Sequence, residues 1–286
     1  MVSTGTRRLA LAAGFITFLL PWCPGTARAA AVPSPADHEA ACSGPFRDKH
    51  PSKKALALVL EAHAQWLEDI QDRHGKRANL CKAGLRGTRL QEANLDRADL
   101  SGADLREADL REATLSEADL YGADLQKADL FGADLGKADL RDAHLGMAIL
   151  YKADLRGANL RGASLPQAVL LGARLGAADL RAARLEEAHL AGADFERATL
   201  AGAVLEGTNL VKANLRGADL RQADLRHANL QEADLNGATL EGSVLSGADL
   251  TGVSGLIQAQ LNRASVGADT KLPAGLMRPP AIPAQP

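Results

Sequence analysis

Aromatic residues are scarce in this sequence, and so are long stretches without charge. Phe, Tyr and Trp together make up 3% of the 286 residues, although 46% are hydrophobic. Leucine and alanine dominate, so a large core is possible only if it is built from small, regular pieces. After the N-terminal segment, no apolar stretch is long enough to span a bilayer.

The chain also lacks an excess of either charge. Its formal net charge is −2, and without Arg7, Arg8 and Arg28 of the N-terminal segment 30 basic residues face 35 acidic ones. This balance gives no reason to expect attraction to nucleic acid or to an anionic membrane. We therefore expect no nucleic-acid partner.

The N-terminal segment has the pattern of a secretory signal peptide. Arg7 and Arg8 precede an uncharged apolar stretch, residues 9–20, and small residues follow at 27 and 29. This pattern is typical of a signal that is cleaved, here after Ala29, although a buried N-terminal helix is an alternative. We predict a mature chain without a membrane span, exported to the periplasm or out of the cell.

Cysteine is rare too, with three in the chain. Cys23 does not indicate a lipoprotein anchor, because Trp22 stands where such sites need a small residue. Removal of the signal peptide leaves two cysteines, Cys42 and Cys81. In an oxidising compartment, an even number of cysteines favours a disulfide. It would close a loop of about 40 residues, worth about 4 kcal/mol in the chain-entropy model. Two free thiols are the alternative.

What the sequence has in abundance is a period of five. From Ala78 to Gly252 it consists of 35 consecutive five-residue units, with leucine at the third position in 34 of them and alanine at the first in 32. A step of five scatters leucines around an α-helix and sends them to alternate faces of a strand. A short extended piece followed by a turn solves this, because alanine and leucine then both point inward.

Units such as ADLSG, ADLRE, ADLYG and ANLRG resemble those of the pentapeptide-repeat proteins, without a break from Ala78 to Gly252. The resemblance implies an all-β solenoid, a right-handed quadrilateral β-helix in which four units make one square coil and residues 20 apart stack. About nine coils would form a rod on the order of 40 Å long, at about 4.8 Å per stacked strand.

A solenoid of this kind needs caps, because its open ends expose leucines and unpaired backbone groups. Ser52 is a candidate N-cap for an amphipathic helix running to about Arg73, and a short helix is expected from Leu256 to Ala264, with Ile257 and Leu261 as lid residues. The predicted order is a signal peptide 1–29, a linker 30–51, a cap helix 52–77, repeats 78–252, a C-terminal cap segment 253–277 and a disordered proline-rich tail 278–286.

No set of residues indicates catalysis, a metal site or a cofactor. The repeat histidines, His144, His189 and His227, do not stand one full coil apart in the sequence, so they should not stack. Aspartates do recur at that spacing, as at Asp99 and Asp119. Such columns could bind a cation or form an acidic surface, but we expect these short side chains to bond to local backbone groups at the turns.

Some cytoplasmic pentapeptide-repeat proteins resemble a DNA duplex to gyrase and inhibit it, which implies an alternative function by mimicry. The repeats here carry 20 basic and 27 acidic residues, a net charge of −7. However, an arginine column that includes Arg141, Arg181 and Arg221 would lie beside aspartates and neutralise much of one face. An export signal would also separate the protein from gyrase.

One departure from the repeat pattern favours a contact surface. In the stretch HLGMAILYKADL, two bulky apolar residues stand beside Leu150 at positions that usually face water. Steps of 20 from them predict two neighbouring outward columns that turn apolar over the same coils. We call their apolar members the apolar patch: Phe131, Ile149, Tyr151, Val169, Leu171 and Val211.

A rimmed apolar patch on a flat face is typical of an interface. The alternatives are cover by residues 30–51 of the same chain, or stacking that stabilises neighbouring strands without a partner. We therefore predict a non-enzymatic scaffold that binds an unknown protein partner or a second copy of itself. An enzyme would require a pocket with a perturbed carboxylate, for example between the cap helix and the first coil.

Overall fold

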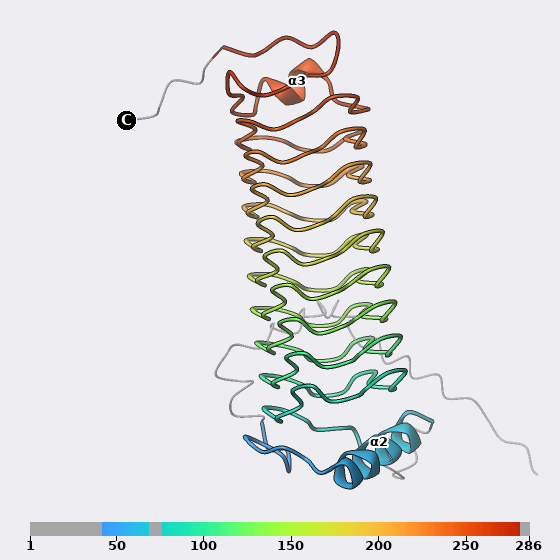
Figure 1. The fold of residues 1–286 in the computed structure, drawn as a ribbon. Coiled ribbons are helices and arrows are strands. Elements are labelled where there is room, and N and C mark those ends of the chain that lie inside the picture. Colours follow the sequence, from blue (N-terminus) through green and yellow to red (C-terminus); the bar gives the residue numbers. More distant parts are fainter. Residues whose placement is uncertain (1–41, 69–75, 281–286) are drawn as a thin grey trace, which may run out of the picture.

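The chain forms a stack of coils with a helix lying across one end (Figure 1). A computed structural model describes residues 42–68 and 76–280. The predicted signal peptide, its cleavage site after Ala29 and the last six residues of the predicted tail lie outside the described residues. Within these residues the helices are α2, Lys53–Glu68, and α3, Gln258–Leu261. Neither is long and apolar enough to cross a membrane.

The stack is held by backbone pairing between equivalent positions of successive coils. Parallel bridges join Asp99 to Asp119 and Asp119 to Asp139, and others recur at every unit along the repeats. The Leu100 N–H donates to the Asp119 carbonyl at 2.7 Å, and the Asp119 N–H donates to the Ala98 carbonyl at 2.9 Å. Each extended piece pairs through one bridging residue rather than a longer strand, because a turn follows at once. Four such pieces complete each coil, which makes it four-sided.

The core is a ladder of alanine and leucine. Side chains such as Ala153 and Leu155 are 0% exposed, and so is Phe195, which replaces one leucine. The predicted inward positions are confirmed along the repeats. Because equivalent side chains stack one coil apart, leucines pack mainly between leucines of the coils on either side, and Phe195 takes the place of one of them in this ladder.

The corners depend on the last residue of each unit. Glu107, for example, has φ of 57°, in the left-handed region. Glycine adopts this region without strain, but 21 described residues that are not glycine also adopt it, many of them Glu, Lys or Gln. At Glu107 the Ala108 N–H closes the turn by donating to the Leu105 carbonyl at 3.0 Å. The stacked hydrogen bonds of the neighbouring coils therefore hold backbone conformations that these residues rarely adopt alone.

The helix α2 lies against the first coil. The N–H of Ala55 donates to the Ser52 hydroxyl at 3.2 Å, as predicted for an N-cap. Leu56 is buried in the main core, and Val59 and Leu60 pack against it. The helix is described as far as Glu68, and the predicted continuation to Arg73 lies outside the described residues.

His63 joins α2 to the start of the repeats. Its ring is fully buried and stacks on Trp66, with ring centroids 5.6 Å apart. Its Nδ1 accepts the Ala78 N–H at 3.0 Å, so the neutral ring carries its proton on Nε2. Burial lowers the pKa of His63 from its usual value of 6.5, and Arg77 lowers it further, whereas Asp96 acts in the opposite direction.

We expect the free energy of unfolding to fall as the pH drops below 6.5, the ordinary pKa of histidine. The unfolded chain takes up the proton first, and the loss levels off once the pH passes below the lowered pKa of folded His63. His63→Asn keeps an acceptor near Nδ1 but cannot titrate, so urea unfolding at pH 5 and pH 8 should show a weaker pH dependence. An equally steep dependence in the variant would contradict this role.

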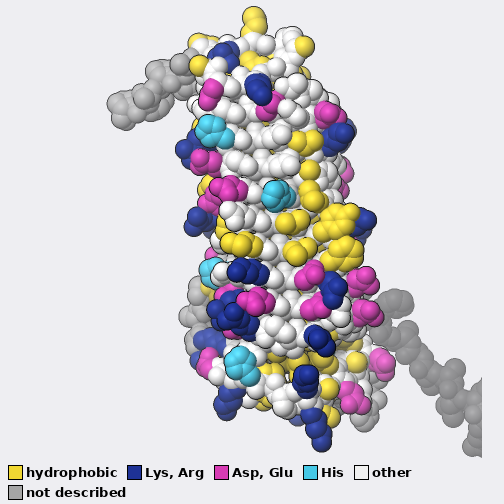
Figure 2. Space-filling model, in the orientation of Figure 1, with side chains coloured by type: hydrophobic (Ala, Val, Ile, Leu, Met, Phe, Trp, Pro, Cys, Tyr) yellow, Lys and Arg dark blue, Asp and Glu magenta, His cyan; other side chains and the backbone are white. Residues whose placement is uncertain are grey.

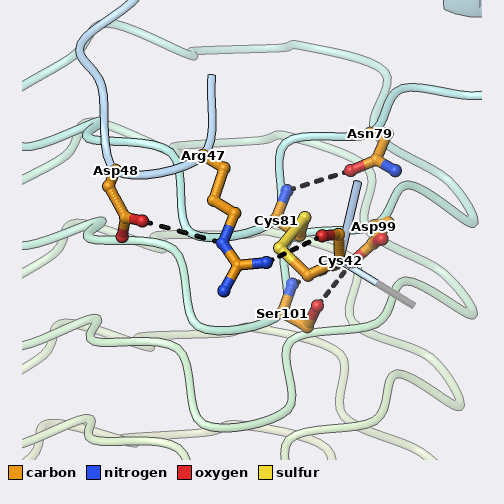
Figure 3. Close-up of a disulfide and its surroundings, with 7 residues drawn as sticks. All are labelled: Cys42, Arg47, Asp48, Asn79, Cys81, Asp99 and Ser101. Carbon is orange, nitrogen blue, oxygen red and sulfur yellow. Dashed lines mark hydrogen bonds and ion pairs between the residues drawn. A yellow bond between two sulfur atoms is a disulfide. The ribbon is translucent and has the colours of Figure 1, made fainter. Parts of the chain in front are cut away.

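A disulfide between Cys42 and Cys81 ties the start of the described chain to the first coil (Figure 3). Arg47 donates to the Cys42 carbonyl at 3.2 Å and lies 3.7 Å from the Asp48 carboxylate. The Asp48 N–H in turn donates to the Lys82 carbonyl at 2.9 Å. Residues 42–51 therefore run beside the first coil.

The C-terminal end differs from the expected helix over Leu256–Ala264. The helix α3 is a single turn, because the Ser265 N–H returns to the ladder by donating to the Ser243 carbonyl at 2.8 Å. Leu261 is fully buried and closes the core, as expected, but Ile257 is 57% exposed and is not a lid residue. In the expected tail, Arg278 donates to the Thr270 carbonyl at 2.9 Å.

Candidate protein-contact face

The first outward column of the apolar patch consists of the residues that follow the leucines of this face: Phe131, Tyr151, Leu171, Ala191 and Val211. Backbone hydrogen bonds hold these residues in register. The Gly132 N–H donates to the Tyr151 carbonyl at 3.0 Å and the Lys152 N–H donates to the Leu171 carbonyl at 3.1 Å. Each residue of this column therefore lies one coil above the previous one. Ala191 separates Val211 from the rest, so Val211 lies two coils beyond Leu171.

The second column stands beside the first. Bridges join Asp129 to Ile149, Ile149 to Val169, and Val169 to His189. The structure thus brings Phe131, Ile149, Tyr151, Val169 and Leu171 together over three successive coils. Figure 2 shows hydrophobic side chains gathered at mid-height of the stack on the face in view.

Stacking covers part of each side chain in the patch. The rings of Phe131 and Tyr151 lie 5.6 Å apart between centroids, tilted by 41°, and the Lys152 ammonium lies 5.1 Å from the Tyr151 centroid. Ile149 remains 40% exposed, and the other members are half-buried. The patch is an even surface of partly covered side chains on a rigid backbone.

Met147 also lies beside the apolar patch, although the spacing of the columns does not predict it. It occupies the turn position two residues before Ile149, has φ of 57°, and is 52% exposed. Its signal in the sequence is a long apolar side chain at a turn position that elsewhere holds mostly Gly, Lys or Glu. Met147 adds an exposed, adaptable side chain beside the patch.

The described part of the N-terminal linker does not cover the patch. Residues 42–51 bond to the first coil, for example through Asp48 and Lys82 and through Lys49 and Gly84. These contacts lie on other faces and at least two coils from Phe131. Stacking within the chain is present, as the ring contact shows, so it contributes whether or not a partner binds.

The stacked aspartates bond to local backbone, as expected. One carboxylate oxygen of each accepts the N–H two residues later, for example Asp119 from Tyr121 at 3.1 Å and Asp129 from Phe131 at 3.1 Å. This arrangement stabilises the turn that follows each leucine. Among the described residues no group of His, Cys, Asp or Glu has the arrangement of a metal site.

Many of these aspartates also hold an arginine two residues later. Seven form such a pair: Asp104, Asp109, Asp139, Asp154, Asp179, Asp219 and Asp224. The hydrogen bond from Arg106 holds the pKa of Asp104 below its usual value, and Arg111 does the same for Asp109. Acidic and basic groups therefore alternate closely, which leaves no continuous acidic face along these columns.

A groove of about 610 Å³ lies between α2 and the first coil. Leu56 and Leu60 form its apolar wall, and Lys53 and Arg89 bring positive charge. None of the described residues that line it carries a carboxylate. His144, His189 and His227 are exposed and lie on separate coils or faces.

These features define a class of protein: a β-helical solenoid of five-residue units that presents flat, rigid faces. The family model for pentapeptide repeats matches residues 76–111, 108–146, 148–186, 178–217 and 218–254. The chain belongs to the pentapeptide-repeat family. Comparison with curated proteins finds no match.

Several solved structures are similar to this chain. HetL, a pentapeptide repeat protein involved in heterocyst differentiation regulation from the cyanobacterium Nostoc sp. strain PCC 7120, is 35% identical, with 68% of this chain and 90% of that chain covered and a TM-score of 0.40. QnrB1, a plasmid-mediated fluoroquinolone resistance protein, is 20% identical, with 63% and 86% covered and a TM-score of 0.42. A protein from the Arabidopsis thaliana thylakoid lumen is 32% identical, with 40% and 81% covered and a TM-score of 0.18.

Proposed function

We propose that this chain is a non-enzymatic scaffold that binds protein through the apolar patch. The observation that carries the proposal is the coincidence of two adjacent outward columns that become apolar over the same coils, with Ile149 40% exposed. Apolar patches with polar surroundings are typical of contact sites, and a flat sheet face needs no reordering before it binds.

We also propose the architecture of this scaffold. The repeats 78–252 form about nine coils of a right-handed β-helix at about 4.8 Å per coil. Residues 52–77 cap the N-terminal end through α2, and residues 253–277 cap the other end. Leu56 and Leu261, which belong to the buried core, support both assignments.

We further propose that the protein acts outside the cytoplasm, in the periplasm or beyond the cell. The N-terminal segment acts as a signal peptide cleaved after Ala29, and residues 30–51 link it to the cap helix. The disulfide between Cys42 and Cys81 supports this location, because such bonds persist in oxidising compartments.

Leu171→Glu tests the contact surface. A carboxylate in the centre of the patch should abolish association, because it must lose its water when a partner covers it. The fold should be unaffected, since other outward positions of the repeats carry glutamate. The measurement is retention of exported proteins on the immobilised chain, together with the mass in solution by light scattering.

Ala201→Glu is the matched control, because Ala201 holds the equivalent position on the opposite face. It should leave association and the circular dichroism spectrum unchanged. If Leu171→Glu retained every association of the unmodified chain, the apolar patch would not be the contact surface.

A further inference from the structure

The outward column of the apolar patch is graded in size. Along successive coils it reads Phe131, Tyr151, Leu171, Ala191 and Val211. The bulky rings lie on the N-terminal side of Leu171 and the smaller side chains on the C-terminal side. Paired with itself in reverse order, as in a copy that runs in the opposite direction, such a column sets its bulky rings against smaller side chains.

We propose that the occupant of the patch is a second copy of this chain, docked face to face and antiparallel. This inference rests on the proposed function and names the partner. A twofold axis perpendicular to the stack, at the level of Leu171, keeps each column opposite itself and reverses its order. Tyr151 then packs on Ala191 of the second copy, Phe131 on Val211, and Leu171 on its own equivalent.

The second column fits the same axis. Val169 meets its equivalent, and Ile149 meets His189 of the second copy. Asp129 meets Asn209, whose amide can donate to a carboxylate. In the parallel alternative, an axis along the stack puts the two columns opposite each other, so that Phe131 faces Asp129. The antiparallel arrangement is favoured because it does not bury that carboxylate against an aromatic ring.

Charges at the rim are complementary in the antiparallel arrangement. Lys212, which lies 3.4 Å from Glu232 in its own chain, comes level with Gly132 of the second copy. Glu112 is one coil from Gly132, and its side chain lies beside that glycine. The axis also brings Glu232 level with Glu112 of the second copy, and Lys212 lies between these two carboxylates, where its ammonium offsets their repulsion.

The contact is small. The graded column spans four coil steps, about 19 Å. An interface of this height buries an area at the low end of the range for specific interfaces. We therefore expect a dissociation constant in the micromolar range. Association should therefore be measured over a wide range of protein concentration.

The test is an exchange of two surface residues that the twofold axis pairs. Tyr151→Ala should weaken dimerisation about tenfold or more, because it removes an aromatic anchor twice. Ala191→Tyr should abolish dimerisation, because two tyrosines then compete for one space. The double variant, with both changes, should restore it. Tyr121 occupies the same position of another unit, so a tyrosine at 191 suits the repeat.

Sedimentation equilibrium of the purified chain and the three variants gives the readout, and circular dichroism confirms that each variant is folded. A dimer that is lost in Ala191→Tyr and recovered in the double variant supports the proposal. A dimer that the double variant does not recover overturns the antiparallel register. A monomer at every concentration overturns the second copy as occupant, and Leu171→Glu against a foreign partner then tests the proposed function separately.

Discussion

Replacing Leu170 with alanine is expected to lower the free energy of unfolding by about 2 to 5 kcal/mol. Leu170 is 0% exposed and points into the middle of the leucine ladder. The change removes buried carbon atoms and leaves a cavity. The coils above and below cannot collapse into it, because hydrogen bonds such as that from Leu170 N–H to the His189 carbonyl, at 2.8 Å, fix their spacing. Urea unfolding followed by circular dichroism measures the loss.

The next residue in the chain is the matched control. Leu171 has the same side chain but points outward in the apolar patch, where it is half-buried. Leu171→Ala should therefore cost less than about 1 kcal/mol in the isolated chain, in the range of stacked surface pairs. If the two alanine variants were equally unstable, the alternation of inward and outward positions would be wrong at this coil.

This contrast shows why so much of the fold could be predicted from the sequence. In a repeat of five, the position within the unit alone decides whether a leucine is buried, so Leu170 and Leu171 are distinguished without any knowledge of distant contacts. The spacing of 20 followed from the family resemblance, and the bridges such as Ile149 with Val169 have that spacing.

The ends were harder to predict, because they break the repeat. The apolar pattern around Ile257 and Leu261 suits a helix of two turns, yet α3 is one turn. Tertiary structure decides here, since Ser265 must pair with Val244 in the ladder. Helical propensity is a local property, so it does not include this tertiary pairing. Ile257 is exposed because the pairing ends the helix early.

The candidate site was predictable to the same extent as the repeat. The columns placed Ile149 and Tyr151 beside their neighbours correctly, because those residues occupy outward positions of regular units. Met147 was missed because a turn position points toward a corner, and its exposure depends on the neighbouring corner residues. The Asp–Arg pairs were foreseen on one column, at Asp139 and Arg141, but they also occur on the other faces.

Removing the disulfide is the second large expected effect. Cys42→Ala combined with Cys81→Ala should lower the free energy of unfolding by about 4 kcal/mol in the chain-entropy model. The two residues are 39 apart in sequence, so the bond restricts a long loop of the unfolded chain, and that loop contains α2. Thermal or urea unfolding of the double variant and the unmodified chain measures the difference.

A reducing agent separates the effect of the bond from that of the substitutions. Dithiothreitol should destabilise the unmodified chain to a similar extent and leave the double variant unchanged. Because residues 42–51 bond to the first coil at Lys82 and Gly84, their release should also raise amide exchange there before it rises in the middle of the stack. An unmodified chain that kept its stability under reducing conditions would show that α2 and the ladder hold this end without the disulfide.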